Sequence, residues 1–433
     1  MIKRILAGGV ALAVLGLGGF GLYAWHPAFD PITPPMADSF APEQIEQGRV
    51  LAAAGYCATC HTAAGGAPFA GNYPMKTDFG TIYSTNITPD AETGIGNWSE
   101  AAFERAMREG VDRSGAHLLP AFPFDHFTKM SDADIAALYA YIMTSVEPVK
   151  AEHKANELPF PLNQRILQAG WKMLFFKSGR FEPVADKSEA WNRGAYLVEG
   201  VTHCGACHTP RNALGAEKTD QPYAGAAIDD WIAPPLTAAN PSGVPWSAAE
   251  FYQYLKTGTT IYHGSAAGPM APVVHAGLKE LPDSDLAAIG TYLGDIVGAG
   301  GADPAANPAV AQSLAAGVPQ ADYRKDEGER LYATACAACH YNSQQITEGR
   351  PDLGINSATR LADPTNLIHV MLNGISADQG MAGVVMPGFG TALNDQQIAA
   401  IAAYLRASRT PEAPWADLET KVATIRALGA MAH

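Results

Sequence analysis

The chain contains the stretch Cys57-Ala58-Thr59-Cys60-His61 and repeats its pattern as Cys204-Gly205-Ala206-Cys207-His208 and Cys336-Ala337-Ala338-Cys339-His340. The three motifs use all six cysteines of the chain. Cysteines three positions apart face the same way on one turn of a helix. There they can form thioethers with the two vinyl groups of one haem, and C-x-x-C-H is the attachment signature of c-type haem.

A C-x-x-C pair can also belong to a zinc knuckle or to a thioredoxin-like redox site. Zinc would need four ligands brought together, and the redox site needs a βαβ context that this sequence does not offer. We therefore predict three covalently bound haem c groups attached to Cys57, Cys60, Cys204, Cys207, Cys336 and Cys339. The histidines that follow each pair, His61, His208 and His340, are predicted to be the proximal iron ligands.

Each motif lies in a repeat of similar helical patterns. A helix containing glycine opens each repeat, around Gly48, Gly194 and Gly328. An amphipathic helix with matching letters closes each repeat, over residues 134–142, 285–293 and 397–405. Alternating strand patterns are nearly absent. We predict an all-α fold of three tandem class I cytochrome c-like domains with an N-terminal transmembrane helix.

The length of 433 residues also suggests roughly three domains. The net charge of −14 argues against binding to nucleic acid. The predicted boundaries are a membrane anchor over 1–28, cytochrome c domain 1 over 29–155, an amphipathic linker over 156–185, cytochrome c domain 2 over 186–298, an Ala/Pro linker over 299–320, cytochrome c domain 3 over 321–410 and a C-terminal tail over 411–433.

The N-terminus begins with two basic residues, Lys3 and Arg4, followed by an uncharged run over 5–25. As a helix, this run would be about 32 Å long, enough to cross a bilayer core. A cleaved signal peptide has a similar start, but the end of this run is a poor cleavage site. We predict an uncleaved anchor in the inner (cytoplasmic) membrane, with the haem domains in the periplasm.

The sixth ligand of each iron determines what the haem can do, and a methionine favours electron transfer. Met270 and Met386 lie in loops ahead of the closing helices of the second and third repeats, and we predict both as distal ligands. Met381 is the rival in the third repeat. The first repeat has Phe122 in the corresponding loop, so its distal ligand is predicted to be His126 or Met75.

Three stretches carry a family resemblance: Gly80-Thr81-Ile82-Tyr83-Ser84-Thr85-Asn86-Ile87-Thr88-Pro89-Asp90, Thr93-Gly94-Ile95-Gly96, and residues 193–212 around the second motif. With them the sequence resembles the three-haem cytochrome c subunit of bacterial membrane-bound periplasmic dehydrogenases. The resemblance implies an electron-transfer subunit that passes electrons from catalytic subunits to ubiquinone and does not itself oxidise the substrate.

Within that family the catalytic partner differs by branch. Phe122 and the retained anchor look most similar to the molybdopterin aldehyde dehydrogenase branch, and the cytochrome subunits of alcohol and gluconate dehydrogenases are relatives. This resemblance implies a molybdopterin catalytic subunit and an iron–sulfur subunit as partners. Two other functions remain open: a catalytic haem protein with an open first haem, and the cytochrome subunit of a terminal oxidase.

Outside the haem domains, the segment 159–181 has the most apolar surface. Trp171, Leu174, Phe175 and Phe176 lie close together in it, and basic residues such as Lys172 flank them. Aromatic and basic residues together suit the headgroup level of a bilayer. We predict that this segment rests on the membrane and helps to form the quinone site; the alternative is a helix that only packs between domains or docks the catalytic subunit.

Overall fold

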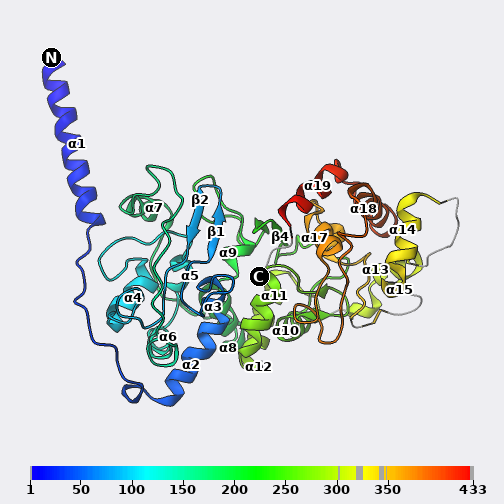
Figure 1. Cartoon of the computed structure of the whole chain (residues 1–433), viewed down its shortest axis with the longest axis horizontal. Helices are drawn as coiled ribbons and strands as arrows, with labels where there is room; N and C mark the ends of the chain where they lie inside the picture. Colours follow the sequence, from blue (N-terminus) through cyan, green and yellow to red (C-terminus); the bar gives the residue numbers. More distant parts are fainter. Residues whose placement is uncertain (1, 301–302, 318–324, 341–345, 348, 430–433) are drawn as a thin grey trace. The chain divides into compact units, whose positions relative to one another are not determined.

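The computed structural model describes residues 2–300, 303–317, 325–340, 346–347 and 349–429. The chain divides into two compact units. The first unit comprises Met1–Ala52 and Cys57–Glu182, and the second comprises Ala53–Tyr56 and Pro183–His433. Figure 1 shows that helices joined by long loops make up most of both units.

The first unit contains most of the first repeat and the N-terminal segment. Its elements are α1 (Ile2–Ala24), the 3-10 turn η1 (Ala37–Ser39), α2 (Pro42–Ala54, whose end falls in the second unit), α3 (Cys57–Cys60), β1 (Pro74–Thr77), β2 (Gly80–Tyr83), α4 (Glu100–Glu109), α5 (Phe124–Phe127), α6 (Asp132–Ser145) and α7 (Leu167–Phe175).

The second unit contains the second and third repeats. The second repeat and the segment after it have α8 (Glu189–Tyr196), the π turn η2 (Leu197–Val201), α9 (Gly205–His208), β3 (Ala226–Ile228), β4 (Trp231–Ala233), α10 (Ala248–Thr257), β5 (Thr259–Thr260), β6 (Gly264–Ser265), α11 (Met270–Pro272), η3 (Val273–Gly277), η4 (Leu278–Glu280), α12 (Asp283–Ile296), η5 (Pro304–Ala306) and α13 (Pro308–Ala316). The third repeat has α14 (Glu327–Ala335), α15 (Ala337–His340), α16 (Ser357–Arg360), α17 (Thr365–Asn373), α18 (Asp395–Arg409) and α19 (Leu418–Leu428).

The opening helix of each repeat packs against the closing helix at a glycine. A Cβ atom on Gly48 would lie 1.9 Å from the Ala137 carbonyl oxygen, and one on Gly328 would lie 2.2 Å from the Ala400 oxygen. Gly194 approaches Ala288 in the same way, at 2.0 Å. Such distances leave no room for a side chain, so the shared glycines and closing helices of the three repeats reflect one common helix contact.

Replacing Gly328 by alanine is expected to lower the free energy of unfolding by about 1–3 kcal/mol, because the new methyl group forces α14 and α18 apart. Urea denaturation of the purified holoprotein measures the change. Gly179→Ala is the control, since a Cβ there meets nothing within 4 Å and should change stability by less than about 0.5 kcal/mol. Equal stability of the two variants would contradict the close helix contact.

The all-α prediction is wrong, because the described residues also form three two-stranded antiparallel sheets. β1 pairs with β2 from Pro74↔Tyr83 to Thr77↔Gly80, and β3 pairs with β4 across a two-residue turn. The turn residues Asp229 and Asp230 both have positive φ, 46° and 60°, as a type I′ hairpin turn requires. The strands are two to four residues long, too short to produce a recognisable alternating pattern.

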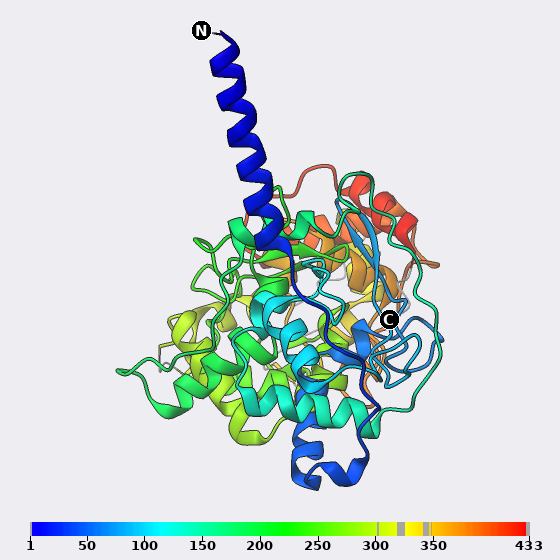
Figure 2. The same ribbon diagram turned by 90° about the vertical axis from the view of Figure 1, so that its left-hand side faces the viewer.

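The N-terminal helix α1 is one continuous helix, shown in dark blue in Figure 2. Among the described residues, no helix combines the length and the apolar character needed to cross a bilayer. A span needs about 20 predominantly apolar residues, whereas six of the 23 residues of α1 are glycines without a side chain. The predicted transmembrane helix is therefore wrong, and so is the inner-membrane anchor with periplasmic haem domains that depended on it.

The second and third repeats are joined by specific contacts within the second unit. The Asn366 side-chain amide of α17 accepts from the Ile232 N–H of β4 and donates to the Ile232 carbonyl, both at 2.8 Å. The neighbouring His369 ring stacks on Trp231 at 4.6 Å between ring centroids. An amide that forms both backbone bonds acts like an additional strand residue along β4.

The predicted linker and tail also contain packed helices. In the segment 299–320, α13 buries Val310 against Val244 and Ile355. In the segment 411–433, α19 contributes Val422 and Ile425 to the core of the third repeat. Residues 301–302, 318–320 and 430–433 of these segments lie outside the described part of the chain. The predicted domain boundaries remain predictions.

Candidate functional site

Each C-x-x-C-H motif forms a single helical turn. The histidine N–H donates to the carbonyl of the first cysteine at 3.0 Å in all three motifs: His61 to Cys57, His208 to Cys204 and His340 to Cys336. The two cysteines of each motif are therefore three residues apart on one turn and face the same side. The six cysteines, all in the described part of the chain, form no disulfide.

The imidazole of each motif is held by a backbone carbonyl. Nδ1 of His61 lies 2.7 Å from the Thr85 oxygen, and Nδ1 of His208 lies 2.7 Å from the Pro234 oxygen. Nδ1 of His340 lies 3.1 Å from the Pro351 oxygen. A carbonyl can only accept, so Nδ1 carries the proton and Nε2 keeps its lone pair. This is the arrangement by which proteins orient a metal-binding histidine.

The protonation of these groups agrees with that arrangement. Burial lowers the pKa of all three histidines, which keeps the imidazoles neutral at pH 7. Burial raises the pKa of Cys57 and of Cys207 to about 12.

Met270 is the first residue of α11 and packs against the buried cluster of Ala266, Ala271 and Val274. Two residues earlier, Gly268 has a φ of 54°, and a Cβ there would lie 2.4 Å from the Trp231 ring. Only glycine lets the loop pass this close to Trp231, so the methionine loop has a fixed path. Its role as an iron ligand remains a prediction.

Met386 lies in an extended segment and pairs with Ile375, a residue just after the end of α17. The two residues exchange both backbone hydrogen bonds, at 2.9 and 3.0 Å. The sulfur of the rival Met381 lies beside Gly349, in the loop that follows the third motif. A Cβ on Gly349 would be 3.0 Å from this sulfur. Nothing in these contacts assigns the sixth ligand, and Met386 remains the prediction.

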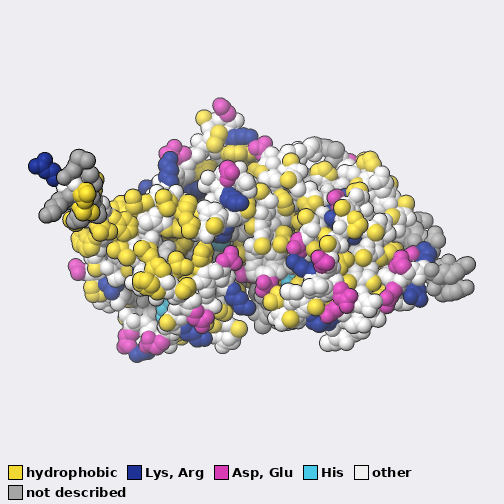
Figure 3. All heavy atoms as spheres, turned by 90° about the horizontal axis from the view of Figure 1, so that it is seen from above, with side chains coloured by type: hydrophobic (Ala, Val, Ile, Leu, Met, Phe, Trp, Pro, Cys, Tyr) yellow, Lys and Arg dark blue, Asp and Glu magenta, His cyan; other side chains and the backbone are white. Residues whose placement is uncertain are grey.

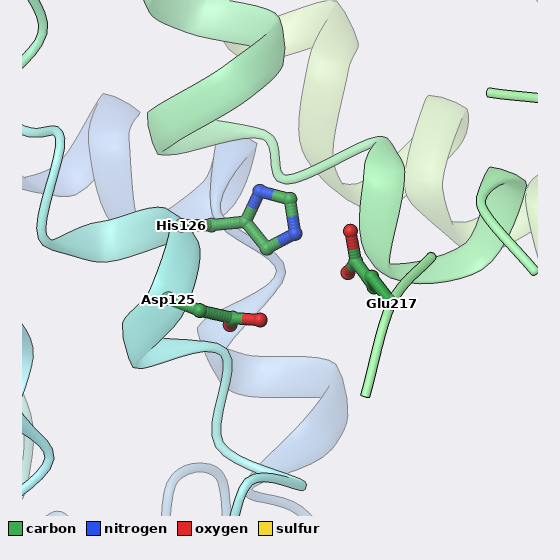
Figure 4. A group of neighbouring side chains, drawn as sticks. All are labelled: Asp125, His126 and Glu217. Carbon is green, nitrogen blue, oxygen red and sulfur yellow. The ribbon is translucent and has the colours of Figure 1, made fainter. Parts of the chain in front are cut away.

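In the first repeat the two candidate ligands lie on different elements. His126 is buried on the short helix α5, next to Asp125 (Figure 4); the third residue drawn there, Glu217, belongs to the second unit. Met75 is half-buried on β1, opposite Ile82. Phe122, at the position of the expected methionine, packs against Phe127 at 5.3 Å between ring centroids. The choice between His126 and Met75 stays open.

The carbonyls that hold the three histidines were missed by the sequence reasoning. They belong to Thr85, Pro234 and Pro351, which lie 24, 26 and 11 residues from their partners. The second and third repeats share a Pro-x-Leu triplet at these positions, Pro234-Pro235-Leu236 and Pro351-Asp352-Leu353. That triplet was the available signal, but the unequal spacings conceal it.

The first unit carries an apolar surface on α7 and the chain before it. Figure 3 shows hydrophobic side chains gathered on this face. Its most exposed members are Phe160 at 80%, Leu174 at 71% and Met173 at 60%. Trp171 packs inward instead, with its ring centroid 6.1 Å from that of Phe124. We call Phe160, Ile166, Leu167, Met173 and Leu174 the α7 face.

The sequence suggests that Lys172 of α7 flanks the apolar residues at the surface. In the structure its side chain is buried instead. Its ammonium donates to the Glu109 and Gly110 carbonyls at the end of α4 and to Nδ1 of His117 at 3.0 Å. Burial, followed by the nearby Arg165 charge, lowers the pKa of Lys172 to about 7, although Glu109 and Asp112 oppose the shift. Lys172 thus joins α7 to α4.

This lowered pKa makes the stability of the first unit depend on pH. Between pH 7 and about 10.5 the unfolded chain keeps a proton on Lys172 that the folded chain has lost, so stability rises with pH in this window. The Lys172→Met variant should lack this rise. Urea denaturation of both proteins at several pH values measures it, and parallel stability curves for the two proteins would show that Lys172 titrates normally.

Comparison with known proteins gives matches along nearly the whole chain. A subunit of the nicotinate dehydrogenase of Pseudomonas putida is 46% identical over 97% of this chain, which spans 35% of that protein. The fructose dehydrogenase cytochrome subunit of Gluconobacter japonicus is 38% identical over 93% of this chain and 85% of its own length. The gluconate 2-dehydrogenase cytochrome c subunit of Pantoea cypripedii is 38% identical, with 94% and 91% covered.

Two family models match individual repeats. The model described as "Cytochrome c" matches residues 45–145, around the first motif. The model described as "Cytochrome C oxidase, cbb3-type, subunit III" matches residues 324–405, around the third motif.

Proposed function

Because the chain belongs to the family of cytochrome c subunits of dehydrogenase complexes, we propose that it carries electrons from a catalytic dehydrogenase subunit to ubiquinone through three haem groups. Its cytochrome c domains carry covalently bound haem c. The arrangement of the three motifs carries this proposal: each has two cysteines on one turn and a histidine whose Nδ1 is held by a carbonyl.

In this proposal the cysteine pairs hold the three haems by thioethers, and His61, His208 and His340 provide Nε2 as proximal ligands. When bound, each haem supplies one-electron transfer. Met270 and Met386 would close the distal side of the second and third haems, and His126 or Met75 that of the first. The residues fit this role because the imidazoles are neutral and already oriented.

The relatives support a catalytic dehydrogenase subunit as the partner. A molybdopterin subunit with an iron–sulfur subunit, acting on aldehydes, was the expectation from the family resemblance. The relative with 46% identity is a nicotinate dehydrogenase subunit, which favours an N-heterocyclic carboxylate as a second candidate substrate. The cbb3-type match covers the third repeat alone, whereas the nicotinate, fructose and gluconate dehydrogenase relatives each match 93% of the chain or more.

Purification of the intact complex tests the partner. Mass spectrometry identifies the copurifying subunits, and reduction of the haems is followed after adding an aldehyde or nicotinate. Haem reduction by either substrate supports the proposal and selects between the two candidates. Copurification with a haem–copper subunit, or reduction by neither substrate, would contradict it.

The α7 face is the proposed place where ubiquinone accepts electrons. A quinone with an isoprenoid tail needs exposed apolar surface, and Leu174 and Met173 provide it. A purely structural function of the segment is the alternative, supported by the inward packing of Trp171 and Lys172.

Replacing both Met173 and Leu174 by serine should therefore slow ubiquinone reduction about tenfold or more and leave ferricyanide reduction unchanged, because ferricyanide needs no apolar site. A tenfold factor corresponds to a loss of about 1.4 kcal/mol in the free energy of quinone binding. Leu214→Ser, at a residue 54% exposed in the second unit, is the control. Equal loss of both activities would mean that the segment is structural.

A further inference from the structure

A buried ion pair lies behind the imidazole of the third motif. Pro351, whose carbonyl holds Nδ1 of His340, is followed directly by Asp352. The Asp352 carboxylate lies 3.2 Å from the guanidinium of Arg409, the last residue of α18. Neither side chain has any exposed surface. Charges without solvent contact are screened poorly, so they act at longer range than surface charges.

Each residue of the ion pair is connected to the third motif through hydrogen bonds. Gly354 N–H and the Ser313 hydroxyl donate to Asp352, which fixes the loop that carries Pro351. Arg409 lies 3.4 Å from the Tyr332 hydroxyl, and that hydroxyl donates to the His340 carbonyl at 3.1 Å. Ser313 belongs to α13, so the helix between the second and third repeats takes part in this arrangement.

The other two motifs lack a charged residue directly after the carbonyl that holds their histidine. The residue after Thr85 is Asn86 and the residue after Pro234 is Pro235, both neutral. The described residues thus place a fully buried ion pair directly after the histidine-holding carbonyl at the third motif.

We propose that Asp352 and Arg409 are positioning residues that set the reduction potential of the haem on His340. Asp352 lowers this potential and Arg409 raises it. This inference rests on the proposed function, because it requires haem on the third motif. A haem held there would take up one electron from the catalytic subunit, without a bond being formed or broken. A carboxylate behind the imidazole makes the ligand more basic and favours Fe(III), whereas a guanidinium favours Fe(II).

The test is a spectroelectrochemical titration of the purified holoprotein and of two single variants. Asp352→Asn keeps the shape of the side chain and removes its charge, so one midpoint should rise. Arg409→Gln should lower the same midpoint. A change of about tenfold in the ratio of reduced to oxidised haem, about 59 mV for one electron, is expected in each direction. The double variant should return close to the wild-type value.

The control is Asp285→Asn, which breaks the ion pair between Asp285 and Arg193 that joins α12 to α8. It should leave all three midpoints unchanged. Single variants that shift the midpoint in the same direction, or that shift no midpoint, would overturn the inference. A general disturbance of the fold would move all three midpoints, which would also overturn it.

If either charge variant fails to fold, Ser313→Ala provides the test without removing a charge. Losing the hydroxyl donor leaves the carboxylate less neutralised, so the same midpoint should fall by less than tenfold in the haem ratio. An unchanged midpoint would overturn the inference. Haem analysis of the wild-type protein distinguishes failure of this inference from failure of the proposed function. If the protein carries three c-type haems and the variants leave their potentials unaltered, only this inference is contradicted. If the third motif carries no haem, the proposed function is contradicted.

Discussion

Replacing Cys336 and Cys339 by alanine should remove one covalently bound haem, so that the predicted haem content falls from three to two per chain. The reason is that the pair has no substitute, since the other four cysteines belong to the other two motifs. Mass spectrometry of the denatured protein and the pyridine haemochrome assay both measure the loss.

The control for this experiment is Ala338→Ser, which changes an exposed residue between the two cysteines and keeps both thiols. It should retain three haems. A cysteine double variant that still carries three haems would exclude attachment at this motif, and a wild-type protein with two would reduce the proposed electron path to two centres.

The single variants Met270→Ala and Met386→Ala should each lose one methionine–iron charge-transfer band. In each variant one midpoint reduction potential should also fall. Axial ligands set haem potentials over a range of roughly 0.8 V, so the shift is expected to be on the order of 100 mV or more. Optical spectra of the oxidised protein and redox titration measure the two effects.

Met371→Leu is the matched control, because Met371 lies 4% exposed in the core of the third repeat. It should keep every band. If Met386→Ala leaves the spectrum unchanged while Met381→Leu removes a band, the distal ligand of the third haem is Met381. An unchanged spectrum in Met270→Ala would remove that residue from the second site.

The sequence allowed the helices to be predicted well because their packing constrains the residues. The closing helices predicted over 134–142, 285–293 and 397–405 lie within α6, α12 and α18. Their apolar positions must face the opening helix, and the glycine of that helix must meet a carbonyl. Both demands leave a pattern in the local sequence that can be recognised without the fold.

The hairpins and the carbonyl acceptors could not be predicted in the same way. The turn of Asp229 and Asp230 has positive φ at both positions, although Asn-Gly is the recognisable sequence for such a turn. The Pro351 oxygen lies beside His340 in a loop whose next residue, Asp352, is held by α13 and α18, which are distant in sequence. Such contacts depend on tertiary structure and leave little local signal.

The amide of Asn366 paired with both backbone groups of Ile232 has a consequence for how the molecule melts. Because the third repeat completes the outer edge of β4 in the second, the two repeats should open together as one cooperative foldon. Calorimetry would then show one heat-absorption peak for the two repeats. A fragment ending before residue 299 would leave β4 with an open edge, and open edges promote self-association of strands.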